Sequence, residues 1–128
     1  TIKISLNSEI KTAYFDPQQF QRVFANLVRN SREAIQHSEV KKGQIHIAVQ
    51  DQDHSLIFRV TDNGPGMPEE IRETVFDPFT TTKSIGTGLG LYLTCEIVEN
   101  HGGTISIESE PGQGTTIQIT IPIEDTLV

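Results

Sequence analysis

Apolar residues recur every three or four positions over residues 17–38, which is the spacing of one face of a helix. Asp16 is a good helix cap, Pro17 suits the first helical position, and Gln19 completes a capping box. The pattern therefore predicts a helix that begins at Pro17 and ends near Ser38. Its apolar stripe consists of Phe20, Phe24, Leu27, Ser31, Ala34 and Ile35, with Val23 and Val28 beside it.

Elsewhere apolar and polar residues alternate with a period of two, which predicts strands with one buried face. The polar tip 50–55 would join one pair of strands as a hairpin, and the turn 110–114 would join the last pair. Asn7-Ser8 is a turn candidate between the first two strands. The predicted strands are 2–6, 10–14, 45–49, 56–60, 104–109 and 115–122.

The segment between the two hairpins contains most of the turn-forming residues. A turn cluster at 62–68 precedes a short acidic helix near 69–75, and residues 76–88 have no clear period. A second apolar helix is predicted over 89–100, ended by the glycines of 101–103. This order of elements predicts an α+β fold, a two-layer sandwich with a mixed, mostly antiparallel sheet and helices on one face.

Composition and charge narrow the class of protein. The 128 residues fit a single domain, and 35% hydrophobic with 21% charged residues is too apolar for disorder and too polar for a membrane-embedded chain. A net charge of −7 argues against non-specific binding to nucleic acid or anionic lipid. The single cysteine, Cys95, excludes an internal disulfide. With no basic-then-apolar leader and no apolar stretch of about 18 residues, we expect a cytoplasmic location.

Two asparagines, Asn26 and Asn30, stand one turn apart on the first predicted helix, on one flank of its apolar stripe. Their carboxamide oxygens can bind a hard cation such as Mg²⁺, which brings phosphates with it. From this helix alone, two ordinary surface amides are the alternative.

A second candidate site lies where Asp62-Asn63-Gly64-Pro65-Gly66 directly follows a buried strand. The carboxylate is delivered to the end of the sheet, where it can accept a hydrogen bond from an amine and fix the edge of a base. The alternative is a plain Asp-Asn-Gly turn.

The glycine run Gly86-Thr87-Gly88-Leu89-Gly90-Leu91 leads into a helix, which offers backbone amides and a positive helix end to a phosphate. Neither common phosphate loop matches it, and a flexible hinge is the alternative. The hydroxyls and one cation of residues 80–84 precede it, on a stretch that can close as a lid. Phe76-Asp77-Pro78-Phe79 places two aromatic rings at the entrance, as an anchor to the core or as a hinge.

Together and in this order, these motifs resemble the ATP-binding catalytic domain of sensor histidine kinases, in the superfamily shared with gyrase and the heat-shock chaperone and mismatch-repair ATPases. The resemblance covers nearly the whole chain and implies the Bergerat-type ATP-binding fold. The matching segments are 26–31 as the asparagine box, 62–66 as the first glycine box, 76–79 as the phenylalanine box, 86–91 as the second glycine box, and 112–115 as the turn between the last strands.

The resemblance implies a role for each matching residue. It implies that Asn30 binds Mg²⁺, that Asn26 supports the phosphates, and that Asp62 accepts the amine of adenine. Gly64 and Gly66 would let the base approach. The other implied nucleotide-binding residues are Thr81, Thr82, Lys83, Gly86, Thr87, Gly88, Leu89, Gly90 and Thr115.

The short segment between the phenylalanine box and the second glycine box looks like the short lid of the nitrogen-regulatory kinases. Arg29 and Lys83 are the candidates for the contact with the γ-phosphate, and we take them with Asn26 as the candidate catalytic residues. Glu33 and Ala34 depart from the family, because many histidine kinases carry a basic and then an aromatic residue there.

Asn26 is a second departure, within the superfamily. The water-activating ATPases carry a glutamate general base four residues before the metal-binding asparagine, and here that position is Asn26. Without a base, attack by water should be slow, which favours phosphoryl transfer to a protein side chain over hydrolysis. The same residue disfavours the related anti-sigma serine kinases, which keep the acidic residue.

None of the four histidines lies in the family's phosphoacceptor pattern. We therefore expect the acceptor on a separate dimerisation domain, and the chain enters its first alternating pattern at Thr1, as a segment of a longer protein would. The resemblance implies this domain and a response-regulator receiver domain as partners, and no direct membrane contact, with membrane anchoring of the parent left open. The isolated domain should be a monomer. The alternatives are a regulatory module that binds nucleotide without transferring phosphate, and an ATPase module.

Overall fold

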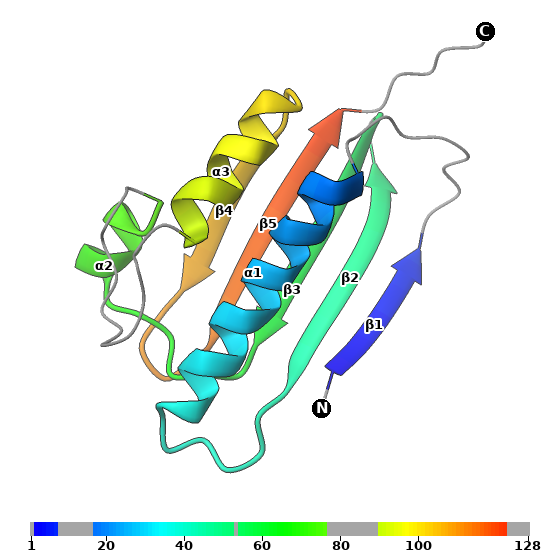
Figure 1. Ribbon diagram of the computed structural model, residues 1–128. Coiled ribbons are helices and arrows are strands. Elements are labelled where there is room, and N and C mark those ends of the chain that lie inside the picture. Colours follow the sequence, from blue (N-terminus) through cyan, green and yellow to red (C-terminus); the bar gives the residue numbers. More distant parts are fainter. Residues whose placement is uncertain (1, 8–16, 53, 77–89, 123–128) are drawn as a thin grey trace, which may run out of the picture.

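The computed structural model describes residues 2–7, 17–52, 54–76 and 90–122, and Figure 1 shows them as one sheet with helices on one face. The helices are α1 (Pro17–Gln36), α2 (Glu69–Thr74) and α3 (Gly90–Asn100). The strands are β1 (Ile2–Asn7), β2 (Ile45–Gln52), β3 (Ser55–Asp62), β4 (Thr104–Ser109) and β5 (Thr115–Pro122).

The sheet has five strands in the order β1-β2-β3-β5-β4. Only the β1–β2 pair is parallel, and the other three pairs are antiparallel. Helices α1 and α3 contact each other and lie side by side across the sheet (Figure 1). The predicted α+β sandwich, with its mixed, mostly antiparallel sheet and helices on one face, is confirmed.

The predicted bounds of β4 and β5 are confirmed, whereas the tip of the other hairpin is shorter than predicted. Gln50 and Gln52 belong to β2 and pair with β3, because backbone pairing continues where side chains are polar. Only residues 53 and 54 separate the strands, and the positive φ of His54, 62°, suits a two-residue hairpin turn. Asn7 is likewise the last residue of β1 and pairs with β2, not part of a turn.

Helix α1 begins at Pro17 as predicted and ends at Gln36, two residues before the predicted end. The Ser38 hydroxyl donates to the carbonyl of Ile35 at 2.7 Å, and this side-chain bond closes the last turn in place of a further helical residue. The short acidic helix is confirmed as α2, and α3 follows the predicted range from Gly90 onward. The predicted strand 10–14 and the cap Asp16 lie outside the described residues.

The core lies between the sheet and the two long helices. The predicted stripe of α1 is confirmed, since Phe20, Leu27 and Ser31 are buried and the others are half-buried. Aromatic rings join α1 to β3 at one end of the molecule, with Phe24 and Phe58 5.1 Å apart between ring centroids. The buried apolar residues of this core are Phe20, Val23, Leu27, Ile45, Leu56, Phe58, Val60, Val98, Ile117, Ile119 and Ile121.

Replacing Ile119 with alanine should lower the free energy of unfolding by about 2–5 kcal/mol, because its side chain is fully buried in β5 and leaves a cavity. Leu93→Ala is the matched control, since Leu93 is 44% exposed and should cost about 0.5 kcal/mol or less. Urea unfolding followed by circular dichroism measures both. Equal losses would contradict this placement of the core.

Candidate functional site

Strand β3 ends in the carboxylate singled out from the sequence. Asp62 is only 7% exposed, because it continues the inward-facing positions of Phe58 and Val60. Its Oδ1 accepts a hydrogen bond from the N–H of Gly64 at 2.9 Å, the one bond of this carboxylate within the described residues. Within the described residues, every fully buried polar side-chain atom has a hydrogen-bond partner. Because Oδ2 of Asp62 has no partner there, it reaches the surface and can accept a hydrogen bond from a ligand.

Asp62 belongs to a row of residues that crosses four strands on the helix-covered face. Ile45 of β2, Thr115 of β5 and Ser109 of β4 complete the row, each directly opposite its neighbour in the register. Side chains opposite each other in an antiparallel pair are adjacent, with Cβ atoms about 5 Å apart. The structure thus places Thr115, a predicted nucleotide-binding residue, beside Asp62.

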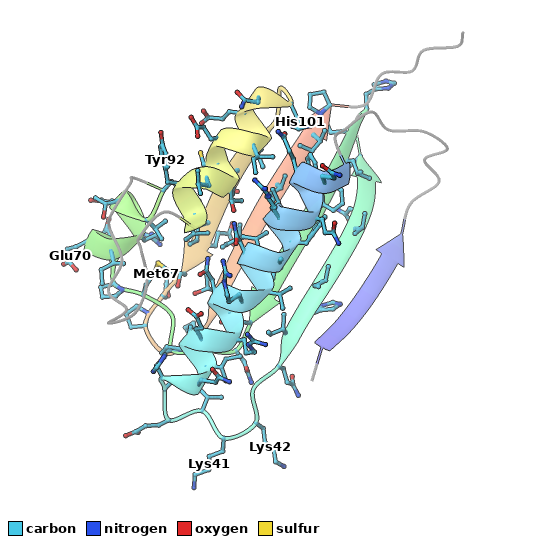
Figure 2. All side chains as sticks on the ribbon, viewed as in Figure 1. Lys41, Lys42, Met67, Glu70, Tyr92 and His101 are labelled. Carbon is cyan, nitrogen blue, oxygen red and sulfur yellow. The ribbon has the colours of Figure 1, made fainter. Side chains whose placement is uncertain are left out.

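The loop after Asp62 is fastened on one side to the segment that joins α1 to β2. The Asn63 side chain donates from Nδ2 to the carbonyl of Lys42 at 2.8 Å and accepts at Oδ1 from the N–H of Gln44 at 2.6 Å. Figure 2 shows Lys41 and Lys42 at this end of the molecule, where α1 ends. An exposed asparagine therefore uses both ends of its amide to position the backbone of the loop.

The same loop is in direct backbone contact with the β4–β5 turn on its other side. A Cβ on Gly66, whose φ is +69°, would lie 1.9 Å from the carbonyl oxygen of Glu110. A Cβ on Gly114, whose φ is +78°, would lie 2.1 Å from the carbonyl oxygen of Asp62. The N–H of Gly112 also donates to the carbonyl of Pro65 at 2.8 Å. Only glycine permits so close an approach.

Ser109, like Asn63, was not recognised as a site residue from the sequence. It is 6% exposed, and its Oγ lies 2.9 Å from the N of Met67, 3.0 Å from the O of Gly114 and 2.8 Å from Oγ1 of Thr115. Figure 2 shows Met67 beside the end of β4. The available signal was the alternation of β4, which makes Ser109 a polar residue at an inward position after Ile105 and Ile107.

Asn26 and Asn30 lie one turn apart on α1 and are both half-buried at the edge of the core, as predicted. The guanidinium of Arg29, on the exposed side of the helix, donates from Nη2 to Oδ1 of Asn26 at 2.5 Å. This bond uses one of the two lone pairs of the Asn26 oxygen and orients the amide, whose NH₂ group can donate to an anion. It also keeps one positive charge beside the asparagine pair.

Several predicted site residues lie outside the described residues. Gly90 is the first residue of α3, so the second glycine box leads directly into a helix, as predicted. Phe76 is half-buried and follows α2, while the rest of the phenylalanine box is not described. The predicted residues in the undescribed segment are Thr81, Thr82, Lys83, Gly86, Thr87, Gly88 and Leu89.

The described ranges give little support to a metal site built from His, Cys, Asp or Glu, or to catalysis by a cysteine nucleophile. No group of three or more His, Cys, Asp or Glu side chains lies close enough there to hold a metal ion. Partial burial, then the hydrogen bond and charge of Glu99, raise the pKa of the Cys95 thiol to about 11. Cys95 is therefore a protonated thiol at neutral pH and a poor nucleophile.

Gly66→Ala and Gly112→Ala form a matched pair, because both residues have a positive φ but only at Gly66 would an added Cβ collide with the backbone of the other segment. Gly112→Ala should cost about 1–2 kcal/mol of unfolding free energy for its left-handed backbone. Gly66→Ala should cost about 1–3 kcal/mol more, because the loop and the turn must move apart. Urea unfolding measures the difference, and equal costs would show that the two backbones do not touch.

The chain resembles a protein family, individual proteins and solved structures. Residues 15–125 match the family described as histidine kinase-, DNA gyrase B- and HSP90-like ATPase. Sporulation kinase A of Bacillus subtilis (strain 168) is 39% identical over 107 residues, which are 84% of this chain and 17% of that protein. Sensor histidine kinase ZraS of Escherichia coli (strain K12) is 34% identical over 126 residues, 98% of this chain and 26% of that protein.

Solved structures agree with these relatives. The catalytic domain of histidine kinase ThkA, in a nucleotide-free form, superposes with a TM-score of 0.77 at 33% identity, over 95% of this chain and 79% of that chain. The mycobacterial sensor histidine kinase MprB gives a TM-score of 0.79 at 25% identity, over 98% and 84%.

The chain spans only 17% and 26% of the length of these two relatives. Among the described residues, none of the helices has the length and hydropathy of a membrane span. The family match, the sensor-kinase relatives and the catalytic-domain fold agree with the motifs found in the sequence. The chain therefore belongs to the family of histidine kinase-, DNA gyrase B- and HSP90-like ATPases, with sensor histidine kinases as its relatives.

Proposed function

We propose that this domain binds Mg²⁺ and ATP and transfers the γ-phosphoryl group to a histidine on a separate dimerisation domain, as the catalytic part of a two-component sensor kinase. The observation that carries the proposal is Asp62, a buried carboxylate with one oxygen reaching the surface at the end of β3. Such an acceptor suits the exocyclic amine of adenine. The family description supports ATP as the nucleotide.

Two glycines and a threonine surround Asp62. A Cβ on Gly64 would lie 3.0 Å from Oδ1 of Asp62 and would crowd the carboxylate, so glycine keeps the approach open. Gly66 holds the loop against the β4–β5 turn, and Thr115 stands beside Asp62 on the same face of the sheet. These residues support a base site at this end of the sheet.

Asn30 would hold Mg²⁺ through its carboxamide oxygen, and the Asn26 amide would donate to the phosphates. The donor set fits the ion, because Mg²⁺ prefers oxygen ligands and keeps several waters, with few protein ligands and substrate phosphates completing its shell. When bound, the ion neutralises charge on the phosphates. The half-burial of both asparagines at the edge of the core supports this role.

The phosphates need further positive groups, because the chain has a net charge of −7. Arg29 lies beside Asn26, and Lys83 is the second candidate for the γ-phosphate. The N-terminus of α3 begins at Gly90 and would offer its positive end and free amides to an anion. The remaining proposed contacts are Thr81, Thr82, Gly86, Thr87, Gly88 and Leu89.

Transfer is favoured over hydrolysis by the amide at position 26. In transfer, a neutral imidazole nitrogen of the acceptor histidine forms a bond to the γ-phosphorus, and the bond to the β,γ-bridging oxygen breaks, releasing ADP. Positioning and charge stabilisation supply most of the catalysis, so no general base is required for such a nucleophile. Asn26 cannot take a proton from water, because a neutral amide is not a base.

Hydrolysis is the second candidate, and one observation favours it. Glu33 is the only carboxylate in the sequence of α1 and is half-buried one turn beyond Asn30. If it activates water, the isolated domain should release phosphate steadily, and Glu33→Gln should stop the release. Binding without either reaction would make the domain a regulatory nucleotide module.

We infer that the parent protein is a larger sensor kinase, with this chain as its single catalytic domain. The small share of the relatives' length that the chain spans supports additional domains, among them the dimerisation domain with the acceptor histidine. A response-regulator receiver domain would then take the phosphoryl group. The same proposal includes a short lid like that of the nitrogen-regulatory kinases. It also includes a cytoplasmic location and a monomeric state for the isolated domain.

Calorimetric titration with a non-hydrolysable ATP analogue should show adenine-selective binding that Mg²⁺ strengthens, with the GTP analogue as the specificity control. Asn30→Ala should abolish the Mg²⁺-dependent part. Asp62→Asn should weaken the preference for adenine by about 10- to 100-fold, because a charged acceptor is lost. Gln21→Ala, an exposed amide on the same helix, is the matched control and should bind like the unaltered chain. Unchanged affinities and selectivity in Asn30→Ala and Asp62→Asn would refute the site.

A supplied dimerisation domain that carries the acceptor histidine tests the reaction itself. With ATP and Mg²⁺, acid-labile and base-stable phosphate should accumulate on that domain, and Asn30→Ala should prevent it. Phosphate release without labelling would identify an ATPase, and tight binding without either product would identify a regulatory module.

A further inference from the structure

Ser109 has a hydroxyl whose hydrogen-bonding capacity is completely used. The residue is 6% exposed, and three polar atoms lie within 3.0 Å of Oγ: the N of Met67, the O of Gly114 and Oγ1 of Thr115. The carbonyl of Ser109 in turn accepts from Nη1 of Arg72 at 3.0 Å, which ties its backbone to α2. Ser109 is therefore held in place by three separate parts of the chain, two of them through its hydroxyl.

The direction of the bond between Ser109 and Thr115 follows from counting protons. A hydroxyl has one proton to donate and two lone pairs to accept with. The Met67 N–H can only donate to Ser109, and the Gly114 carbonyl can only accept its single proton. The remaining lone pair of Ser109 must accept, so Thr115 is the donor in the third bond.

This direction decides what Thr115 can offer to a ligand. With its proton committed to Ser109, the Thr115 hydroxyl has only lone pairs left and is an acceptor. Thr115 lies directly opposite Asp62 in the register, and the Asp62 carboxylate is also an acceptor. Two acceptors therefore stand side by side at the end of β3 and β5.

We propose that Ser109 is a specificity-determining positioning residue, which fixes Thr115 as an acceptor and so makes the base site select an exocyclic amine over a carbonyl oxygen. The inference rests on the proposed function. At that site the acceptor pair attracts the amine of adenine and repels the O6 oxygen of guanine. Without Ser109, the Thr115 hydroxyl can rotate and donate to O6, so discrimination against guanine falls.

Calorimetric dissociation constants for non-hydrolysable ATP and GTP analogues, with Mg²⁺, test this on the full chain. Ser109→Ala should reduce the ATP-to-GTP preference about three- to tenfold, the worth of one neutral hydrogen bond, mainly by tightening GTP. Thr115→Val, which removes the hydroxyl at nearly constant shape, should also reduce the preference. Thr115→Ser should keep it. Ser106→Ala, an exposed position of β4, is the control and should leave it unchanged.

The double variant separates this role from a merely structural one. If Ser109 acts through Thr115, adding Ser109→Ala to Thr115→Val should not change the preference further, whereas a general loosening of the loop would lower it again. If Ser109→Ala does not fold, an unchanged preference in Thr115→Val overturns the proposal. An unaltered chain without adenine-selective binding refutes the proposed function itself. Selective binding that survives Ser109→Ala overturns only the role of Ser109.

Discussion

The close contact between the backbone after β3 and the β4–β5 turn is the constraint on which the site depends. Gly66 and Gly114 have no room for a Cβ, each because a carbonyl oxygen of the other segment occupies that space. The strand register places Asp62, Thr115 and Ser109 in one row across the sheet, and the contact holds the loop against this row. A side chain at either glycine would separate the row from the loop that carries Gly64.

The proposed base site is built on closely packed core residues. The inward positions that precede Asp62 on β3 and follow Thr115 on β5 are buried core residues, Val60 and Ile117, and these two are paired with each other. Any shift of the row would disturb this packing, which interiors tolerate poorly. The Asn63 amide and the Ser109 hydroxyl then transmit the position of the sheet to the loop. Selectivity for the base is thereby tied to the stability of the core.

Periodic elements could be predicted from the sequence, and contacts between distant segments could not. The predictions for β4, β5 and the start of α1 are correct, because local alternation determines the strands and Pro17 suits the first position of a helix. The tip of the β2–β3 hairpin was wrong because polarity of side chains does not end a backbone ladder. Asp62 and the asparagine pair carried motif signals. Ser109 lies in no motif, and Asn63 lies in the first glycine box but was given no role, because the roles of both depend on partners that only the sheet register and the folded loops bring near.

The proposed site has a base end at Asp62 and a phosphate end at α1, and the charge of the chain explains why the two ends differ. A domain with a net charge of −7 repels a polyphosphate at long range, so affinity must come from short-range contacts that the fold places in advance. The base site supplies such contacts from neutral and acidic groups that favour an amine, which is compatible with the overall charge. The proposed phosphate end needs donors instead, and on α1 the bond from Arg29 to the Asn26 oxygen orients the amide whose NH₂ group is the proposed donor. The same principle is proposed for both ends: a neighbouring side chain, Ser109 or Arg29, fixes the orientation of the neutral group that meets the ligand.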